Sequence, residues 1–463
     1  MEDRIVTYGM LGIAIENCSR RIVSLGIAKD GLVAVCIQNP IRHFTLCLAL
    51  YRIGIRSMSL EHGQAGIADL TFAAVLGDSE ARPLVAPANR FIAVTDDWFA
   101  TDPVGSDSLP AGFSNPKEIC HYALTSGSTG VRKSFGCTIE YVGRHVPLAI
   151  VYNCKLVLCM LGLSSAWGFL IACATLATGK TLCFAVSPYQ AVRMIELFSI
   201  DYFMASFDQL VGITRAARKL SAQLRSLRTI VVGGNVPSRA LLEAATVYVC
   251  KDIICRYGNT EIGLVADAAA SEVLSKPGLI GRVVPDVELA VFGPDGGKLP
   301  PGRVGIIKGR IKTWIGDAPG NSTDDHPWGD IGDVGWATTD NQFYVVGRTL
   351  DIAAAGIDDA SARQVSPVNE VEDLLRLEWD AADAAAVLID GISDGSKAEI
   401  WVATVDCKDA SSEKLEAILR HRGIEGIVRL VPVSSIPRGA NGKVQRAQLK
   451  SLMLGSTGKT PEL

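Results

Sequence analysis

Glycines, hydroxyl side chains and basic residues are concentrated between Thr125 and Lys133, in the segment TSGSTGVRK. The apolar stretch HYAL precedes this segment, which is typical of a strand that runs into a loop. Glycines allow backbone N–H groups to point into a concave loop, hydroxyl groups add donors, and Lys133 adds positive charge. Such a loop suits a polyphosphate, although it lacks the G-x-x-x-x-G-K-[ST] pattern of a Walker A loop. Taken alone, it is also compatible with a flexible surface turn.

Three later segments combine acids, aromatic residues and cations in a way that could serve the same ligand. They are RYGNTE at 256–261, the pair GD at 332–333 with YVVGRTLD at 344–351, and PRGANGKVQR at 437–446. Each is ordinary on its own, because loop acids, a core tyrosine and a surface lysine are common in any globular protein. Their joint presence in one chain is what points to a nucleotide.

In this order, the four segments resemble the signature motifs of the adenylate-forming enzymes. This superfamily comprises the acyl- and aryl-CoA synthetases, the luciferases and the adenylation domains of peptide synthetases. The resemblance extends over nearly the whole chain. It implies that a carboxylate attacks the α-phosphate of ATP to form acyl-AMP and pyrophosphate, after which a thiol attacks the acyl carbon. The protein must then align two anions and shield their charges.

The resemblance assigns the first segment to the β- and γ-phosphates of ATP. The residues so assigned are Thr125, Ser126, Gly127, Ser128, Thr129, Gly130 and Lys133. It also implies that Gly233 and Gly234, in TIVVGGN, let the backbone pass close to the nucleotide and the acyl group.

The resemblance further implies a role for each of five residues in the middle segments. Tyr257 would stack on adenine and Thr260 would donate to the α-phosphate. Glu261 would hold Mg²⁺, a hard cation that prefers oxygen ligands. Asp333 would accept hydrogen bonds from the ribose hydroxyls, and Arg348 would contact the same sugar.

The last two implied roles concern movement and charge delivery. Lys443 would reach the substrate carboxylate and the α-phosphate and neutralise the charge that develops there. Asp351 would be a hinge between a large domain, residues 1–350, and a small domain, residues 351–463. Rotation of the small domain would withdraw Lys443 for the thiol half-reaction.

Several departures from the superfamily pattern bear on the substrates. Arg132, Ser134 and Arg256 stand where Pro, Gly and a small residue are usual, and LGLSSAWGF at 161–169 lacks a gating histidine. The acid that binds an α-amino group in peptide-synthetase domains is also missing, which argues against amino acids. The segment after Asp351 is atypical, so the thiol acceptor is less certain than adenylation. We therefore expect a small carboxylic acid and coenzyme A. A carrier protein with a phosphopantetheine thiol, and a non-catalytic ligand-binding relative, are the alternatives.

Composition sets the remaining limits. The chain has 463 residues, 48% of them hydrophobic and 20% charged, with a formal net charge of −4, so neither disorder nor a nucleic-acid surface is expected. The twelve cysteines lie mostly in apolar runs without zinc-ligand spacing, which predicts reduced core residues and a cytoplasmic location.

Residues 156–179 carry no charge, but the interruptions in GLSSAWG favour a strand, a loop and a buried helix over a membrane span. No G-x-G-x-x-G follows a strand, which disfavours a dinucleotide-binding dehydrogenase. The oligomeric state cannot be inferred.

Hydrophobic periodicity predicts an α/β fold with mainly parallel sheets over about the first 250 residues. The expected elements are helices at 8–29, 43–53, 191–199 and 208–227, strands at 31–38, 55–60, 181–186, 202–206 and 229–234, and a helix followed by a strand within 71–86. Short runs separated by Pro and Gly from about residue 280 predict a small antiparallel sheet or barrel. Beyond Asp351 we expect an α+β module with helices at 368–378 and 413–422 and strands at 384–390, 398–406 and 426–433.

Overall fold

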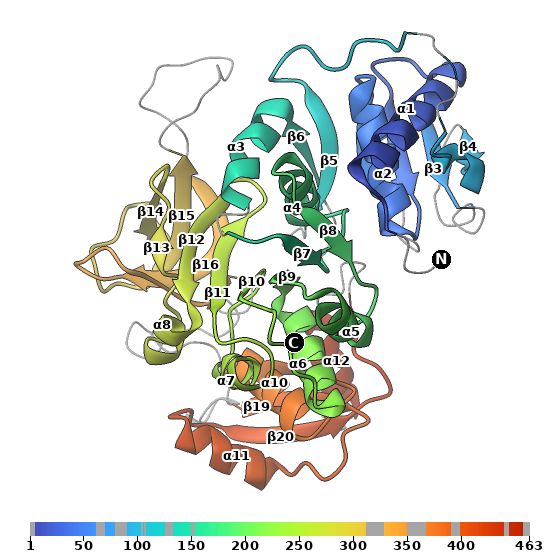
Figure 1. Cartoon of the computed structure of the whole chain (residues 1–463). Helices are drawn as coiled ribbons and strands as arrows, with labels where there is room; N and C mark the ends of the chain where they lie inside the picture. The colour runs from blue at the N-terminus through green and yellow to red at the C-terminus, as the bar shows by residue number, and fades with distance from the viewer. Residues whose placement is uncertain are drawn as a thin grey trace. The chain divides into compact units, whose positions relative to one another are not determined.

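The computed structural model describes residues 5–61, 70–78, 90–102, 105, 108–125, 133–149, 153–311, 328–349, 367–389, 399–438 and 444–456. The chain divides into two compact units, Met1–Asn153 with Leu161–Phe184, and Cys154–Met160 with Ala185–Leu463. Figure 1 shows the elements of both, and each unit is described by itself.

The first unit contains a mainly parallel sheet in the order β4-β3-β1-β2-β5-β6. Its strands are β1 (Leu32–Cys36), β2 (Arg56–Ser59), β3 (Ala74–Gly77), β4 (Phe91–Ala93), β5 (Ile119–Thr125) and β6 (Lys133–Thr138). β1 is buried along its whole length, as expected for a strand covered on both faces. β5 and β6 form an antiparallel pair at one edge.

Four helices, a 3₁₀ turn and a short strand complete this unit. They are α1 (Tyr8–Ser24), α2 (Pro40–Arg52), η2 (Asp96–Phe99), α3 (Ile139–Ala149), α4 (Ala166–Ala177) and β8 (Thr181–Phe184). The side chain of Thr7 caps α1 by accepting from Met10 N, and Asn39 caps α2 directly before Pro40, where proline is tolerated. The two helices pack on each other, and residues such as Phe44 and Leu50 join the core.

The second unit contains strands in the order β13-β12-β11-β10-β9-β7. They are β7 (Leu156–Cys159), β9 (Tyr202–Ser206), β10 (Thr229–Gly233), β11 (Ile253–Asn259), β12 (Gly263–Ala269) and β13 (Arg282–Val283). The helices are α5 (Pro188–Phe198), α6 (Phe207–Leu220), α7 (Arg239–Tyr248) and α8 (Ala270–Ser275). β7, β9, β10 and β11 are mutually parallel, so their carboxyl ends share one edge of the sheet.

A four-stranded antiparallel sheet follows, in agreement with the change of pattern near residue 280. Its strands are β14 (Val287–Phe292), β15 (Gly305–Ile311), β16 (Gly329–Ala337) and β17 (Phe343–Arg348), paired in that order. Its core includes Val287, Ile307 and Val345, which cluster with Ile262 and Val265 beside β12. This cluster joins the small sheet to the larger one.

The C-terminal part forms a module with its own three-stranded sheet, β18-β19-β20. Its elements are α10 (Val368–Glu378), β18 (Asp383–Ile389), β19 (Glu399–Val405), α11 (Ser412–His421), β20 (Ile427–Pro432) and α12 (Arg446–Ser456). The predicted helices and strands of this module are confirmed. α10 also packs against α6 and α7, and α7 and α10 lie side by side in Figure 1. The domain boundary predicted at residues 350–351 falls outside the described residues.

One sequence expectation was wrong. Residues 74–77 lie in the first part of the 71–86 segment, where a helix was predicted before a strand, but they form β3, which pairs in parallel with β1. A short apolar run of this kind does not distinguish a buried strand from a buried helix, and here sheet pairing decides.

The uncharged stretch 156–179 contains β7 and α4, as predicted. Within the described part of the chain, no helix is long and apolar enough to cross a membrane. Nine of the twelve cysteines are buried, which confirms that most are core residues.

Candidate functional site

The carboxyl ends of β9, β10 and β11 meet at one level of the sheet. Gly233, the last residue of β10, is in register with Ser206 on β9 and with Arg256 on β11. Gly234 follows with φ +93°, a backbone conformation that residues with a side chain rarely adopt. In open α/β sheets, ligands bind outside the carboxyl ends of the strands. The structure therefore places both predicted glycines at the edge where a ligand would be bound.

Tyr257 lies one residue beyond this level and contacts the small antiparallel sheet. Its hydroxyl group donates a hydrogen bond to Oδ2 of Asp333 on β16, over 2.7 Å. Burial raises the pKa of the Tyr257 phenol well above its ordinary value, and the negative charge of Asp333 raises it further. The phenol therefore keeps its proton and remains a donor to the carboxylate.

Asp333 is also bound by Arg348. The two residues are cross-strand partners on β16 and β17, and Nε of Arg348 lies 3.3 Å from Oδ1 of Asp333. The Asp333 side chain is 7% exposed, whereas that of Arg348 is 42% exposed. Each carboxylate oxygen has two lone pairs, so one carboxylate can serve several donors at once. The structure thus brings Tyr257, Asp333 and Arg348 together, as the resemblance implied.

Thr260 and Glu261 lie in the tight turn between β11 and β12. Oδ1 of Asn259 accepts a hydrogen bond from Ile262 N over 2.9 Å and closes this turn. Gly258 must be glycine, because a Cβ there would lie 2.1 Å from the carbonyl oxygen of Gly263. Glu261 is exposed. Mg²⁺ usually binds one or two carboxylates, substrate phosphates and water, so a single accessible carboxylate fits that ion.

Arg256, which departs from the superfamily pattern, has a partner directly opposite it on β12. Its Nε and Nη2 donate to the two oxygens of Asp267, each over 2.9 Å, and Arg256 is only 9% exposed. A bidentate pair of this kind is strong and directional. It holds the two strands in register beside the irregularity at Tyr257 and Gly258. The unusual arginine is thus explained by Asp267, which sequence analysis did not single out.

The segment predicted to bind phosphates belongs to the first unit, where the structure describes its two flanks. Thr125 ends β5 and Lys133 begins β6, and these residues are register partners in an antiparallel pair. The loop therefore closes a hairpin, with the exposed Lys133 at its base. Ser126, Gly127, Ser128, Thr129 and Gly130 lie outside the described residues, as do Asp351 and Lys443.

Sequence reasoning missed a set of contacts between the C-terminal module and the segment that follows Gly234. Asn369, Glu370 and Asp373 on α10 all bind within residues 236–240. These partners are 130 to 135 residues apart in the sequence. No local pattern could have indicated them.

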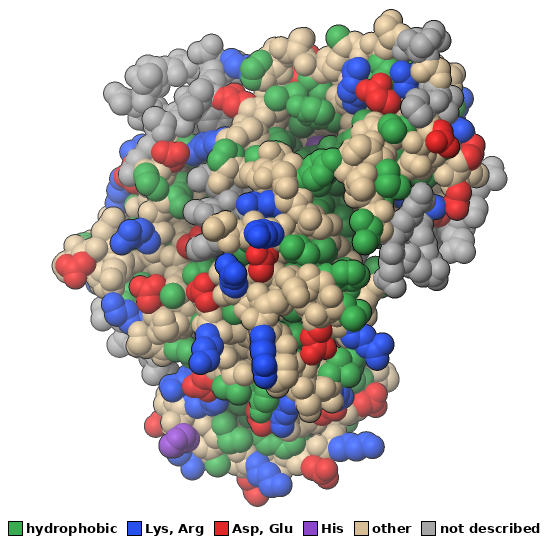
Figure 2. Space-filling view, in the orientation of Figure 1, with side chains coloured by type: hydrophobic (Ala, Val, Ile, Leu, Met, Phe, Trp, Pro, Cys, Tyr) green, Lys and Arg blue, Asp and Glu red, His purple; other side chains and the backbone are tan. Residues whose placement is uncertain are grey.

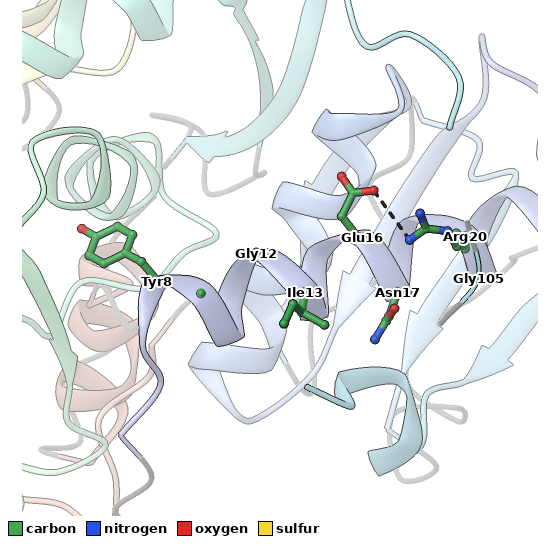
Figure 3. Close-up of a pocket in the computed structure, with 8 residues that line it drawn as sticks. Tyr8, Gly12, Ile13, Glu16, Asn17, Arg20 and Gly105 are labelled. Carbon is green, nitrogen blue, oxygen red and sulfur yellow. Dashed lines mark ion pairs between the residues drawn. The ribbon is translucent and has the colours of Figure 1, made fainter. Parts of the chain in front are cut away.

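A separate shallow pocket of about 360 Å³ lies on α1 in the first unit (Figure 3). It is lined by Tyr8, Gly9, Gly12, Ile13, Glu16, Asn17, Arg20 and Gly105. Glu16 and Arg20 form an ion pair of 3.6 Å, one helical turn apart. None of the predicted site residues lines this pocket.

Comparison with known proteins identifies the family of this chain. The sequence profile described as AMP-binding enzyme matches residues 1–310. A 4-coumarate–CoA ligase-like protein from Oryza sativa subsp. japonica is 28% identical over 305 residues, covering 63% of this chain and 50% of that protein. This chain thus spans about half the length of that relative.

Two solved structures share the fold over nearly their whole length. An amide bond synthetase from Marinactinospora thermotolerans has a TM-score of 0.74 and 24% identity, with 96% of this chain and 94% of that chain covered. The o-succinylbenzoate CoA synthetase from Bacillus subtilis, in complex with ATP and a magnesium ion, has a TM-score of 0.74 and 19% identity, with 97% and 95% covered. Since the family profile covers well over half of the sequence, this chain belongs to the AMP-binding enzyme family.

Proposed function

We propose that this protein activates a small carboxylic acid with ATP, releases pyrophosphate and transfers the acyl group from acyl-AMP to the thiol of coenzyme A. The observation that carries the proposal is the Tyr257–Asp333–Arg348 arrangement beside Gly233 and Gly234. A buried carboxylate suits the vicinal diol of a ribose, and an aromatic ring beside it suits a base.

The residues would share the work of the first half-reaction. Asp333, oriented by Tyr257 and Arg348, would fix the ribose. The backbone at Gly233 and Gly234 would pass close to the nucleotide and the acyl group. Thr260 would donate to the α-phosphate, and Lys443 and the 125–133 loop would offset the negative charge that two meeting anions bring.

Glu261 would hold Mg²⁺, which supplies charge neutralisation on the phosphates when bound. The exposed carboxylate in a rigid turn supports this assignment, and the solved relative in complex with ATP and a magnesium ion is consistent with it.

The test is ATP–pyrophosphate exchange with a panel of aliphatic, aryl and amino acids. We expect exchange with at least one aliphatic or aryl acid and none with amino acids. The matched control is Asp333→Asn, which preserves the shape of the side chain but removes its charge. Absence of exchange with every acid would favour a non-catalytic ligand-binding relative.

The acceptor requires a second assay, in which the acyl-AMP formed is offered three nucleophiles. We expect coenzyme A to be consumed in preference to a phosphopantetheine-bearing carrier protein. An amine belongs in the same comparison, because one solved structure with this fold is an amide bond synthetase. Exclusive transfer to the carrier or to the amine would replace the coenzyme A step while leaving adenylation intact.

A further inference from the structure

α10 contacts the segment that joins β10 to α7. Nδ2 of Asn369 donates to the carbonyl oxygen of Val236 over 2.9 Å. Oδ2 of Asp373 accepts from Oγ of Ser238 over 2.6 Å. Because residues four positions apart lie on the same helix face, these two contacts come from one side of α10.

A third contact falls on the first turn of α7. Both carboxylate oxygens of Glu370 lie 3.2 Å from Ala240 N, which has no partner within the helix because it is in the first turn. Ser238, the N-cap, accepts from Leu241 N over 3.0 Å. A carboxylate at a helix N-terminus is stabilised by the helix dipole as well as by the hydrogen bond.

These contacts are buried rather than peripheral. Ser238 is 4% exposed, Glu370 is 6% exposed and Asp373 is 7% exposed. Burying a carboxylate is costly unless hydrogen bonds or ion pairs compensate it. Glu370 is compensated by Ala240 N and by Arg422 at 2.9 Å, and Asp373 by Ser238 and by Arg376 at 3.5 Å. The conformation of the 236–240 segment is therefore coupled to α10.

The segment held in this way begins directly after the two glycines. Gly234 has φ +93°, and Oδ1 of the next residue, Asn235, accepts from Val236 N over 2.9 Å. One residue separates Gly234 from the first backbone atom that α10 binds. A displacement of Val236 would be transmitted to Gly234, whose conformation only glycine adopts readily.

We propose that Asn369, Glu370 and Asp373 are positioning residues, which fix the backbone at Gly233 and Gly234 for the nucleotide and the acyl group by holding residues 236–240. The role in catalysis rests on the proposed function. The C-terminal module therefore shapes the substrate-binding edge of the sheet through α10, independently of Lys443.

The structure offers a matched control at the same interface. Asp380, just beyond α10, pairs with Arg215 at 2.6 Å and with Lys219 at 2.9 Å on α6. These ion pairs join the C-terminal module to α6 but do not involve residues 233–240. Asp380→Asn should weaken docking of the module without releasing the segment.

The experiment compares Asn369→Ala, Glu370→Ala and Asp373→Ala, which remove the acceptors or the donor on α10, with Asp380→Asn in the full chain. Hydrogen–deuterium exchange of the amides at 234–241 should accelerate several-fold in the first three variants and stay at the wild-type rate in Asp380→Asn. In ATP–pyrophosphate exchange, the apparent KM for ATP and acid should rise about tenfold in the first three variants, the loss expected for about one hydrogen bond. Asn369→Ala removes no buried charge, so this variant tests the contact without a folding defect. The melting temperature of each variant would report such a defect.

Two results would overturn the proposal. One is an equal acceleration of amide exchange in Asp380→Asn, because general loosening of the module would then suffice. The other is unchanged exchange at 234–241 in all three α10 variants. A wild-type protein without pyrophosphate exchange would instead refute the proposed function, and the amide exchange would still decide whether α10 holds the segment.

Discussion

The hydroxyl group of Tyr257 donates a hydrogen bond to Asp333 over 2.7 Å, although the two residues are 76 positions apart in the sequence. The bond joins two different sheets. β11 supplies an aromatic ring, and β16 supplies a carboxylate that Arg348 also contacts. The ring and the carboxylate are held in a fixed relation before any ligand is bound. Such pre-organisation lowers the entropic cost of binding a ribonucleotide.

Tyr257→Phe tests this relation. The variant removes the donor to Asp333 but keeps the ring, so stacking would remain while the carboxylate loses an orienting bond. A hydrogen bond to a charged group contributes about 1.5–3 kcal/mol, which corresponds to a loss of roughly 10- to 100-fold in kcat/KM for ATP. Steady-state pyrophosphate exchange measures this loss in kcat/KM. Tyr344→Phe is the control, since the Tyr344 hydroxyl contacts Gln342 rather than Asp333; an equal loss there would contradict the assignment.

Glu261→Gln should weaken the dependence of activity on Mg²⁺. The amide preserves the shape of the side chain but removes the charge that a hard cation prefers. The Mg²⁺ concentration that supports half-maximal pyrophosphate exchange should rise, and excess Mg²⁺ should partly restore the rate. A Mg²⁺ titration of the two proteins checks this. Glu261 would not be the ligand if the two titration curves coincide.

Much of this fold could be predicted from the sequence, because hydrophobic periodicity is local. The helices and strands between residues 367 and 433 follow from amphipathic runs bounded by turns, whereas α12 was not predicted. α6 has a full capping box at Ser206 and Gln209. The residues 74–77 could not be assigned correctly. Four apolar residues carry too little periodicity, and their pairing with β1 is set by tertiary contacts.

In the candidate site, too, the residues within local motifs could be predicted from the sequence, whereas their tertiary contacts could not. Tyr257, Asp333 and Arg348 lie in recognisable motifs, so their presence could be predicted, and the resemblance implied their proximity. The bond between Tyr257 and Asp333, the pairing of Arg256 with Asp267 and the contacts of α10 with residues 236–240 depend on tertiary packing. Figure 2 shows basic and acidic side chains interspersed on the face in view, so charge composition alone did not indicate which residues pair.

Lys443→Ala should abolish most adenylation while the fold remains intact. The proposed role is to neutralise charge that develops as the carboxylate meets the α-phosphate, and losing such a group typically costs about 10²- to 10³-fold in rate. Thiol transfer from supplied acyl-AMP should survive. Both half-reactions should be measured, with Lys450→Ala on α12 as the control. Adenylation by Lys443→Ala at the wild-type rate would refute the role.

Asp351→Pro should separate the two half-reactions if residue 351 is a hinge. Proline fixes φ near −65° and removes a backbone donor, so one orientation of the small domain would be trapped. One half-reaction should persist while the other is strongly reduced, with little change in melting temperature. Equal loss of both rates at unchanged stability would exclude the hinge assignment.

Asp373 should make stability depend on pH in the direction opposite to that of most acids. The pKa of this carboxyl group is raised to about 7, chiefly by burial. Arg376 and the Ser238 hydroxyl lower the pKa and Glu372 and Asp208 raise it, and about 7 is the net result. The folded protein therefore holds a proton that the unfolded chain has released between about pH 4 and pH 7. The free energy of unfolding should fall as pH rises through this window and level off above it.

Asp373→Asn should remove this component, because the amide does not titrate and can still bond to Ser238. Chemical denaturation of both proteins at a series of pH values measures the difference between their free energies of unfolding. Asp380→Asn provides the contrast. Hydrogen bonds from Lys219 and Arg215 lower the pKa of Asp380, so its contribution is present at neutral pH and is lost as pH falls. If the stability advantage of the wild-type protein over Asp373→Asn instead falls on acidification, as it does for a paired surface acid, the pKa of Asp373 is not raised in the folded protein.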